Sequence, residues 1–172
     1  MMKSRKSTIS LFLFYLLALS GIILFKTRLA FAFLGMRFTF VMDVERSINL
    51  IPFGAMLYLN GMPSYNEIFY NGLVFVPFGI FISMLRKKKA FLHLIVPIIL
   101  TSLFFEAMQY IFALGASDIT DVISNTFGGI IGIGIFYLFH KLCKEKVYQA
   151  INIIALVCEI GLVLLIGMII LL

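Results

Sequence analysis

The chain has 172 residues, of which 62% are hydrophobic, a formal net charge of +6 and a mean hydropathy of +1.10. A soluble domain usually has about 45–50% apolar residues, so the polar side chains here are too few to cover a surface that faces water. The composition therefore excludes a soluble globular domain and predicts a single, all-α integral membrane domain over residues 1–172.

Five apolar stretches approach the ~20 residues that a helix needs to cross about 30 Å of hydrocarbon. They cover about residues 8–25, 68–85, 91–112, 119–139 and 148–172. The first follows the basic start "MMKSRK", as in a signal peptide, but Lys26 and Arg28 come directly after it and no small-x-small cleavage site follows. We therefore expect a retained first helix.

The basic residues gather at the ends of the predicted spans. They form "KSRK" at 3–6, "RKKK" at 86–89 and "HKLCKEK" at 140–146, which all fall on one side of a five-span chain. Short segments rich in Lys and Arg stay in the cytoplasm. We expect a cytoplasmic N-terminus, a C-terminus outside, and membrane lipids rather than nucleic acid as partners.

The cysteines and histidines do not form a recognisable metal or nucleophile site. Cys143 and Cys158 lie in or beside apolar helices, without the spacing of a disulfide framework or a zinc site. His93 and His140 are expected near the inner ends of spans. We therefore expect neither a metal nor a cofactor.

The segment between the first two spans, residues 26–67, is predicted to lie outside. It is apolar in "FAFLGMRFTFVM" and "INLIPFGAMLYL", which are too short or too interrupted to cross the membrane. In water these stretches would expose a large apolar patch. Interfacial or re-entrant packing against the outer leaflet suits them better.

Several polar side chains fall in the outer third of the predicted membrane, close to the short turn "ALGAS". They are Asn71, Glu106, Gln109, Asp118, Asp121 and Asn125. Those on each helix are three or four residues apart and so share a face, and a charged residue deep in a membrane normally faces the bundle interior or a wet cavity. Arg46, in the outer segment, is the candidate cation, since a bidentate contact with a carboxylate offsets part of the desolvation cost.

A second pattern on the fourth span predicts close helix packing. Ser124, Gly128 and Gly132 are four residues apart and include a GxxxG motif. Lipid supplies no hydrophobic drive for helix association, so small residues that let two backbones approach are important.

Purely structural roles remain open for the polar residues. Asp118 is a candidate N-cap of the fourth helix, with Asp121 favoured in its first turn by the helix dipole. Glu106 and Gln109 are alternatively hydrogen-bonding links between helices, as is Asn71. Glu159 is isolated in the middle of the fifth span and is not assigned a role.

Four blocks in this order resemble the VanZ family. They are "RSINLIPF" (46–53), "NGLVFVPFG" (71–79), "FEAMQ" (105–109) and "DITDVISNTFGGIIG" (118–132). The likeness covers about residues 46–139 and adds Asn49 to the candidate binding residues. Many family members carry an Arg just before the DxxD-like block, where Ala116 and Ser117 stand here, so Arg46 is the expected carboxylate partner. The resemblance implies a bacterial plasma-membrane protein associated with resistance to teicoplanin rather than vancomycin.

Two main hypotheses of function follow, and we favour the first. The first is a non-enzymatic protein whose outward polar site recognises a lipid-anchored envelope component or the acylated drug. The alternative is an integral-membrane enzyme that modifies an envelope lipid or glycan, with Glu106 and Asp121 as an acid/base pair. A transporter is disfavoured because five spans show no clear inverted repeat. The oligomeric state is left open.

Overall fold

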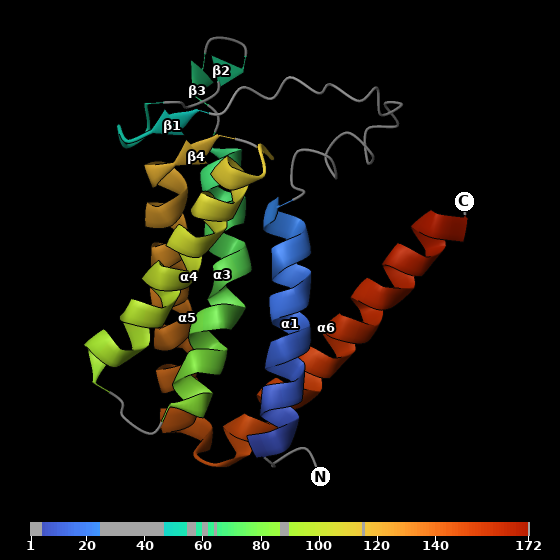
Figure 1. Cartoon of the computed structure of the whole chain (residues 1–172). Helices are drawn as coiled ribbons and strands as arrows, with labels where there is room; N and C mark the ends of the chain where they lie inside the picture. Colours follow the sequence, from blue (N-terminus) through green and yellow to red (C-terminus); the bar gives the residue numbers. More distant parts are fainter. Residues whose placement is uncertain are drawn as a thin grey trace.

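A computed structural model describes residues 5–24, 47–54, 58–59, 62–63, 65–86, 90–114 and 116–171. Figure 1 shows long helices with short strands at one end of the bundle. The helices are α1 (Arg5–Leu24), α3 (Asn66–Leu85), α4 (Phe91–Ile111), α5 (Ile119–Cys143) and α6 (Lys146–Leu171). All five are long and apolar enough to cross a membrane, which confirms the predicted all-α fold with about five spans. The described part of the N-terminal helix begins at the end of the bundle opposite the strands.

Helices α3 and α5 form the centre of the bundle and touch through their backbones. A Cβ atom on Gly128 would fall on the carbonyl oxygen of Gly72, and one on Gly132 would fall on that of Val76. From the other side, a Cβ on Gly79 would fall on the carbonyl oxygen of Gly129. Glycines on both helices therefore permit an approach that a side chain would prevent, as membrane helix pairs require.

An apolar core joins α1 and α4 to this central pair. Its buried members are Leu19, Ile23, Phe75, Phe78, Ile82, Leu94, Ile98, Phe105 and Ile133. On α1, the Tyr15 hydroxyl donates a hydrogen bond of 2.6 Å to the backbone carbonyl of Val74 on α3. The ring of Phe12 packs edge-on to Phe78, with centroids 5.5 Å apart. Aromatic packing and one polar contact thus fix α1 against α3.

Helix α6 is set apart from the other four. It leaves the bundle near its first turns and diverges toward the C-terminus (Figure 1), and only 6% of its apolar window is buried. Its fixed points lie near its start, where Val147 is buried and the Asn152 amide donates a 3.0 Å hydrogen bond to the Thr8 hydroxyl of α1. Most of the apolar surface of α6 is therefore left to lipid.

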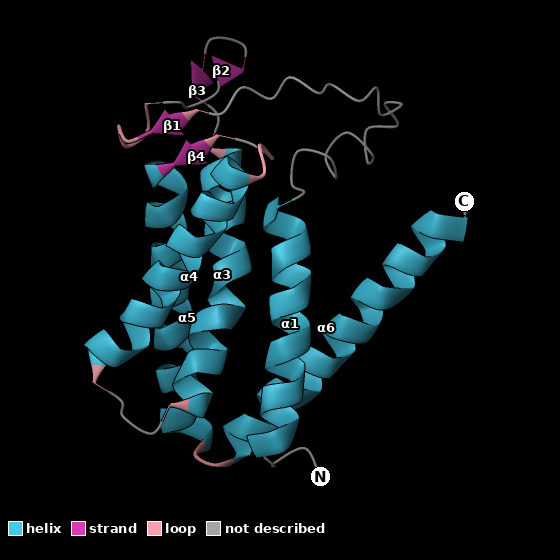
Figure 2. Cartoon of the chain, in the orientation of Figure 1, coloured by secondary structure: helices cyan, strands magenta, loops and turns pink. Residues whose placement is uncertain are grey.

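Two small pairs of strands, absent from our predictions, lie at the end of the bundle opposite the start of α1 (Figure 2). Strand β1 (Ile48–Asn49) pairs in parallel with β4 (Ser117–Asp118), and β2 (Tyr58–Leu59) pairs antiparallel with β3 (Met62–Pro63). Two-residue strands carry no periodic pattern, which explains why they were not predicted. Most of the segment predicted to be interfacial or re-entrant, residues 26–46 above all, lies outside the described residues.

Candidate functional site

Three polar side chains of α4 point into the bundle near its strand end. Ser102, Glu106 and Gln109 are spaced by four and three residues and so lie on one helix face, and each is at most 4% exposed. A Glu106 carboxylate oxygen accepts a 2.8 Å hydrogen bond from the backbone N–H of Asp118. The Gln109 amide instead donates a 3.1 Å bond to the Ile23 carbonyl of α1. Both side chains therefore link α4 to other parts of the chain.

Asp118 caps α5 and also binds the paired strand. Its backbone is extended, and one carboxylate oxygen accepts a 2.7 Å hydrogen bond from the Thr120 N–H, as an N-cap does. The other oxygen accepts a 3.1 Å bond from the Asn49 amide, whose own oxygen accepts from the Ile51 N–H. The capping role is thus present, combined with a contact that joins two distant parts of the chain.

Residues 47–54, which we call the strap, lie over the start of α5. The Ser117 N–H donates to the Ser47 carbonyl at 3.0 Å, and the Phe53 N–H donates to the Thr120 hydroxyl at 2.9 Å. Leu50 and Ile51 in the strap are 73% and 70% exposed. The strap is therefore fixed mainly by polar contacts with Asp118 and its neighbours, while its apolar side chains point away.

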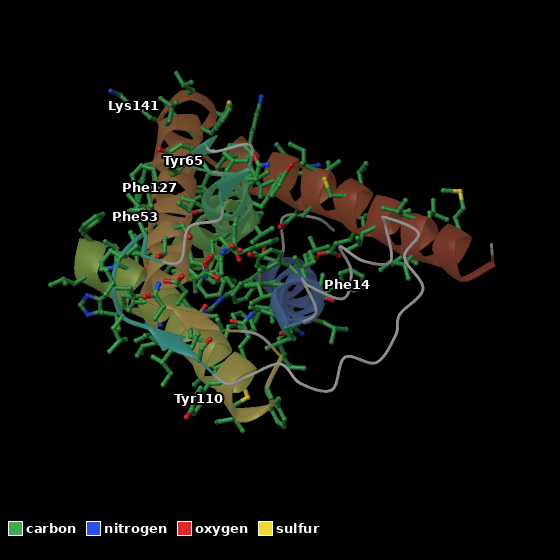
Figure 3. All side chains as sticks on the ribbon, turned by 90° about the horizontal axis from the view of Figure 1, so that it is seen from above. Phe14, Phe53, Tyr65, Tyr110, Phe127 and Lys141 are labelled. Carbon is green, nitrogen blue, oxygen red and sulfur yellow. The ribbon has the colours of Figure 1, made fainter. Side chains whose placement is uncertain are left out.

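The remaining predicted polar residues are also buried at this end. Asn125 of α5 is 1% exposed and donates a 2.8 Å hydrogen bond to the Ser102 hydroxyl, while Asp121, one turn earlier, is 5% exposed. Asn71 of α3 is 8% exposed and precedes Gly72, whose Cβ would lie 3.3 Å from the Ser124 carbonyl. Figure 3, from above, shows side-chain oxygen and nitrogen atoms gathered between the helices, whereas the labelled Phe127 and Tyr110 lie toward the outside.

Three amide atoms in this polar cluster are buried and have no hydrogen-bond partner among the residues that the structure describes. They are Nδ2 of Asn71, Oε1 of Gln109 and Oδ1 of Asn125. Leaving a buried donor or acceptor unsatisfied costs about 1–3 kcal/mol. Such groups in a folded protein call for a specific explanation, such as a water, an ion or a ligand.

The sequence-predicted residues differ in how they are connected. Hydrogen bonds join Glu106 to Asp118 and Asp118 to Asn49, whereas Asn125 bonds to Ser102, and Gln109 bonds to α1. Arg46, the predicted cation, lies outside the described residues. Sequence reasoning missed Ser102 and Thr120. Ser102 carries a detectable signal, since it stands four residues before Glu106 on the same face.

The packing residues predicted on α5 lie against α3. Gly128 and Gly132 face the α3 backbone, and the Ser124 carbonyl lies near Gly72, while the Ser124 hydroxyl donates to the Asp121 carbonyl at 3.1 Å. This places the small face of α5 toward α3, so the polar residues of α5 that contact α4 occupy a different side of the helix. Helix α5 therefore packs against α3 with one side and contacts α4 with another.

The chemistry available at the cluster is that of carboxylates and amides. In the described part of the chain, no group of three His, Cys, Asp or Glu residues could hold a metal ion. Glu106 and Asp121 are buried carboxylates on adjacent helices, and the amides supply both donors and acceptors. The cluster is therefore suited to hydrogen bonding and charge recognition.

Together the fold and the cluster define a multi-pass helical membrane protein with buried polar groups near one end of the bundle. Residues 12–140 match the model of the VanZ/LLP1 family, and the chain belongs to this family. It is 39% identical over 102 residues to Protein VanZ of Enterococcus faecium, an alignment that covers 59% of this chain and 60% of that protein. The chain thus matches less than two thirds of that relative's length. No solved structure matches.

Proposed function

We propose that this protein protects bacteria against teicoplanin by recognising a lipid-anchored envelope component, or the acylated drug itself, at the polar cluster. The observation that carries the proposal is the set of three buried amide atoms, contributed by α3, α4 and α5, that find no partner in the described part of the chain. A ligand that accepts from Asn71 and donates to Gln109 and Asn125 would remove the cost of leaving them unsatisfied. Arg46 is proposed to bind an anionic group of this ligand.

The depth of the cluster supports a ligand with a lipid tail. Glu106 stands five residues before the last residue of α4, or about 8 Å at ~1.5 Å per residue. Asn125 stands six residues after the first residue of α5, or about 9 Å. Polar groups at this depth lie near the boundary between headgroups and acyl chains. A ligand anchored by an acyl tail would reach this level, which fits action on teicoplanin rather than vancomycin.

We propose that the strap moves to admit the ligand, because it contacts Ser117, Asp118 and Thr120 at the start of α5 and the cluster itself is buried. The strap is held by a few hydrogen bonds and leaves Leu50 and Ile51 exposed, so it is a segment that can open at small cost. A ligand that binds the open form better would shift the population toward it. We propose that these exposed apolar side chains contact lipid or the ligand's tail at the outer surface.

An enzyme is the alternative, and the placement of two carboxylates favours it. Glu106 and Asp121 are at most 5% exposed and come from neighbouring helices. One of them would act as general acid and the other as base on an envelope lipid or glycan. A comparison of envelope lipids from cells with and without the protein tests this alternative. New or lost species would favour it over binding alone.

The deciding experiment measures the inhibitory concentration of teicoplanin for cells that express the wild type, Glu106→Gln or Asp121→Asn at matched membrane abundance. Glu145→Gln is the control, since that side chain is 82% exposed at the opposite end of the bundle. Vancomycin serves as the control drug. We expect both site variants to lose protection while the control keeps it. Full protection by both site variants would contradict the proposal.

A further inference from the structure

A groove lies at the opposite end of the bundle from the polar cluster, on the surface of α4. It has a volume of about 480 Å³, with Arg86 at the C-terminal cap of α3 and His93 in the first turn of α4 at its edge. Both side chains are exposed. Arg86 therefore gives this edge of the groove a positive charge.

Pro97 explains why a groove forms at this place. It stands inside α4 and lacks an N–H, so the His93 carbonyl loses the helical donor that a different residue at position 97 would supply. Proline within a helix also bends it, and the first half of α4 diverges from α3 and α5 (Figure 1). The bend opens space beside Arg86 and leaves a backbone acceptor at the polar edge.

The rest of the groove is largely apolar and runs along α4. Leu92, Val96 and Leu100 line it at intervals of four residues, so they form a row on one helix face. All three are exposed to the surroundings of the bundle, by 72%, 46% and 60%. Leu92 and Leu100 are eight positions apart, so the row extends about 12 Å along α4 at ~1.5 Å per residue. One end is cationic and the length is apolar, so the groove complements the anionic phosphate and the acyl chain of a phospholipid.

We propose that this groove binds an anionic phospholipid of the adjacent leaflet, with its phosphate at Arg86 and one acyl chain along the row of Leu92, Val96 and Leu100. Basic sites beside transmembrane helices on the cytoplasmic side bind anionic headgroups through charge. An arginine suits a phosphate because its planar guanidinium donates two parallel hydrogen bonds. The proposal is independent of the polar cluster at the strand end, since the two sites share no residue.

The test uses the full chain, purified from vesicles that contain equal amounts of phosphatidylglycerol and phosphatidylcholine. Native mass spectrometry counts the lipid adducts. The wild type is expected to retain phosphatidylglycerol in preference, and Arg86→Gln to lower those adducts about fivefold, the effect of one basic residue near an anionic surface. Arg5→Gln, an exposed cation at the same end, is the control for general surface charge and should lower those adducts less than Arg86→Gln does. Arg86→Lys should recover part of the binding.

A second variant tests the apolar half of the site without changing any charge. Val96→Trp fills the groove and should lower adducts of both lipids. Equal retention of the two lipids by the wild type, or identical behaviour of Arg86→Gln and Arg5→Gln, would overturn the proposal. So would a Val96→Trp protein that keeps its lipid adducts but loses a dimer, since a second copy of the chain would then occupy the groove.

Discussion

The carboxylate of Glu106 accepts a hydrogen bond of 2.8 Å from the backbone N–H of Asp118. This bond joins the last turns of α4 to the N-cap residue of α5. The N–H groups at a helix start have no partner within the helix, and a nearby carboxylate is favoured there by the helix dipole. A single side chain thus fixes the short turn between two antiparallel helices. The strap binds the same residue, because its Asn49 amide donates a hydrogen bond to the Asp118 carboxylate.

Two substitutions of Glu106 test the contributions of its hydrogen bond and of its charge to stability separately. Glu106→Gln keeps an oxygen that accepts from Asp118, so we expect the midpoint of thermal unfolding in detergent to change little. Glu106→Leu leaves the part-buried Asp118 N–H without this acceptor and should lower stability by about 1 kcal/mol. Glu145→Leu, at an exposed position, is the matched control. Equal stability of Glu106→Leu and wild type would show that the contact contributes nothing to folding.

The pair Asn49 and Asp118 is suited to a double-mutant cycle. In Asp118→Asn, the capping oxygen is kept but the other face turns an amide N–H toward the Asn49 amide, so stability should fall. Asn49→Asp alone places two carboxylates together and should also destabilise. The double variant restores a donor opposite an acceptor, and we expect a coupling of roughly 0.5–3 kcal/mol in thermal unfolding. Additive losses would mean that the strap does not depend on this contact.

Gly128 is predicted to tolerate no side chain. Gly128→Ala places a methyl group on the Gly72 carbonyl and should destabilise the helix pair by about 1–3 kcal/mol, the usual cost of overpacking. Gly134→Ala is the control on the same helix, because nothing lies within 4 Å of its Cβ position, and it should be neutral or stabilising by up to about 1 kcal/mol. The two variants would melt together if α3 and α5 did not touch.

The hydrogen-bonded pair of Ser102 and Asn125 allows the effect on function to be separated from the effect on stability. The double variant Ser102→Ala and Asn125→Leu removes both partners of a buried hydrogen bond together with the unpaired Asn125 oxygen. Removing both partners is often nearly neutral, so we expect unfolding midpoints close to wild type. Protection against teicoplanin should nevertheless fall. A large loss of stability with full protection at matched abundance would assign these residues to folding alone.

The proposed orientation predicts which side of the membrane each end of the bundle faces. Cys143 is exposed at the end of α5, and Leu50 is exposed in the strap. With Cys158 replaced by Ala, a membrane-impermeant maleimide should label Cys143 only after the cells are permeabilised. With Cys143→Ser as well, Leu50→Cys should be labelled on intact cells. The reverse pattern would place the N-terminus outside.

The sequence by itself determined that this is a membrane protein, surrounded largely by lipid, and that it is built of about five spanning helices. Apolar stretches of membrane-spanning length predict each helix to within a few residues, because hydropathy depends on composition and not on neighbours. Counting residues from the helix ends predicted one depth for the polar side chains, and periodicity predicted one face for Asp118, Asp121 and Asn125. Asp118, however, lies just before α5 as its extended N-cap and so does not share the face of the helix. Four short blocks in order identified the family.

Only the tertiary structure decided which residues meet. Periodicity gives a helix face but not the neighbour against that face, so the packing of Gly128 on α3 and the bond from Gln109 to the Ile23 carbonyl of α1 could not be read from spacing. The contact between Asn49 and Asp118 joins positions 69 residues apart through strands of two residues, which leave no pattern. Such contacts depend on how helices rotate and pack, and that is set by the whole bundle rather than by any one segment.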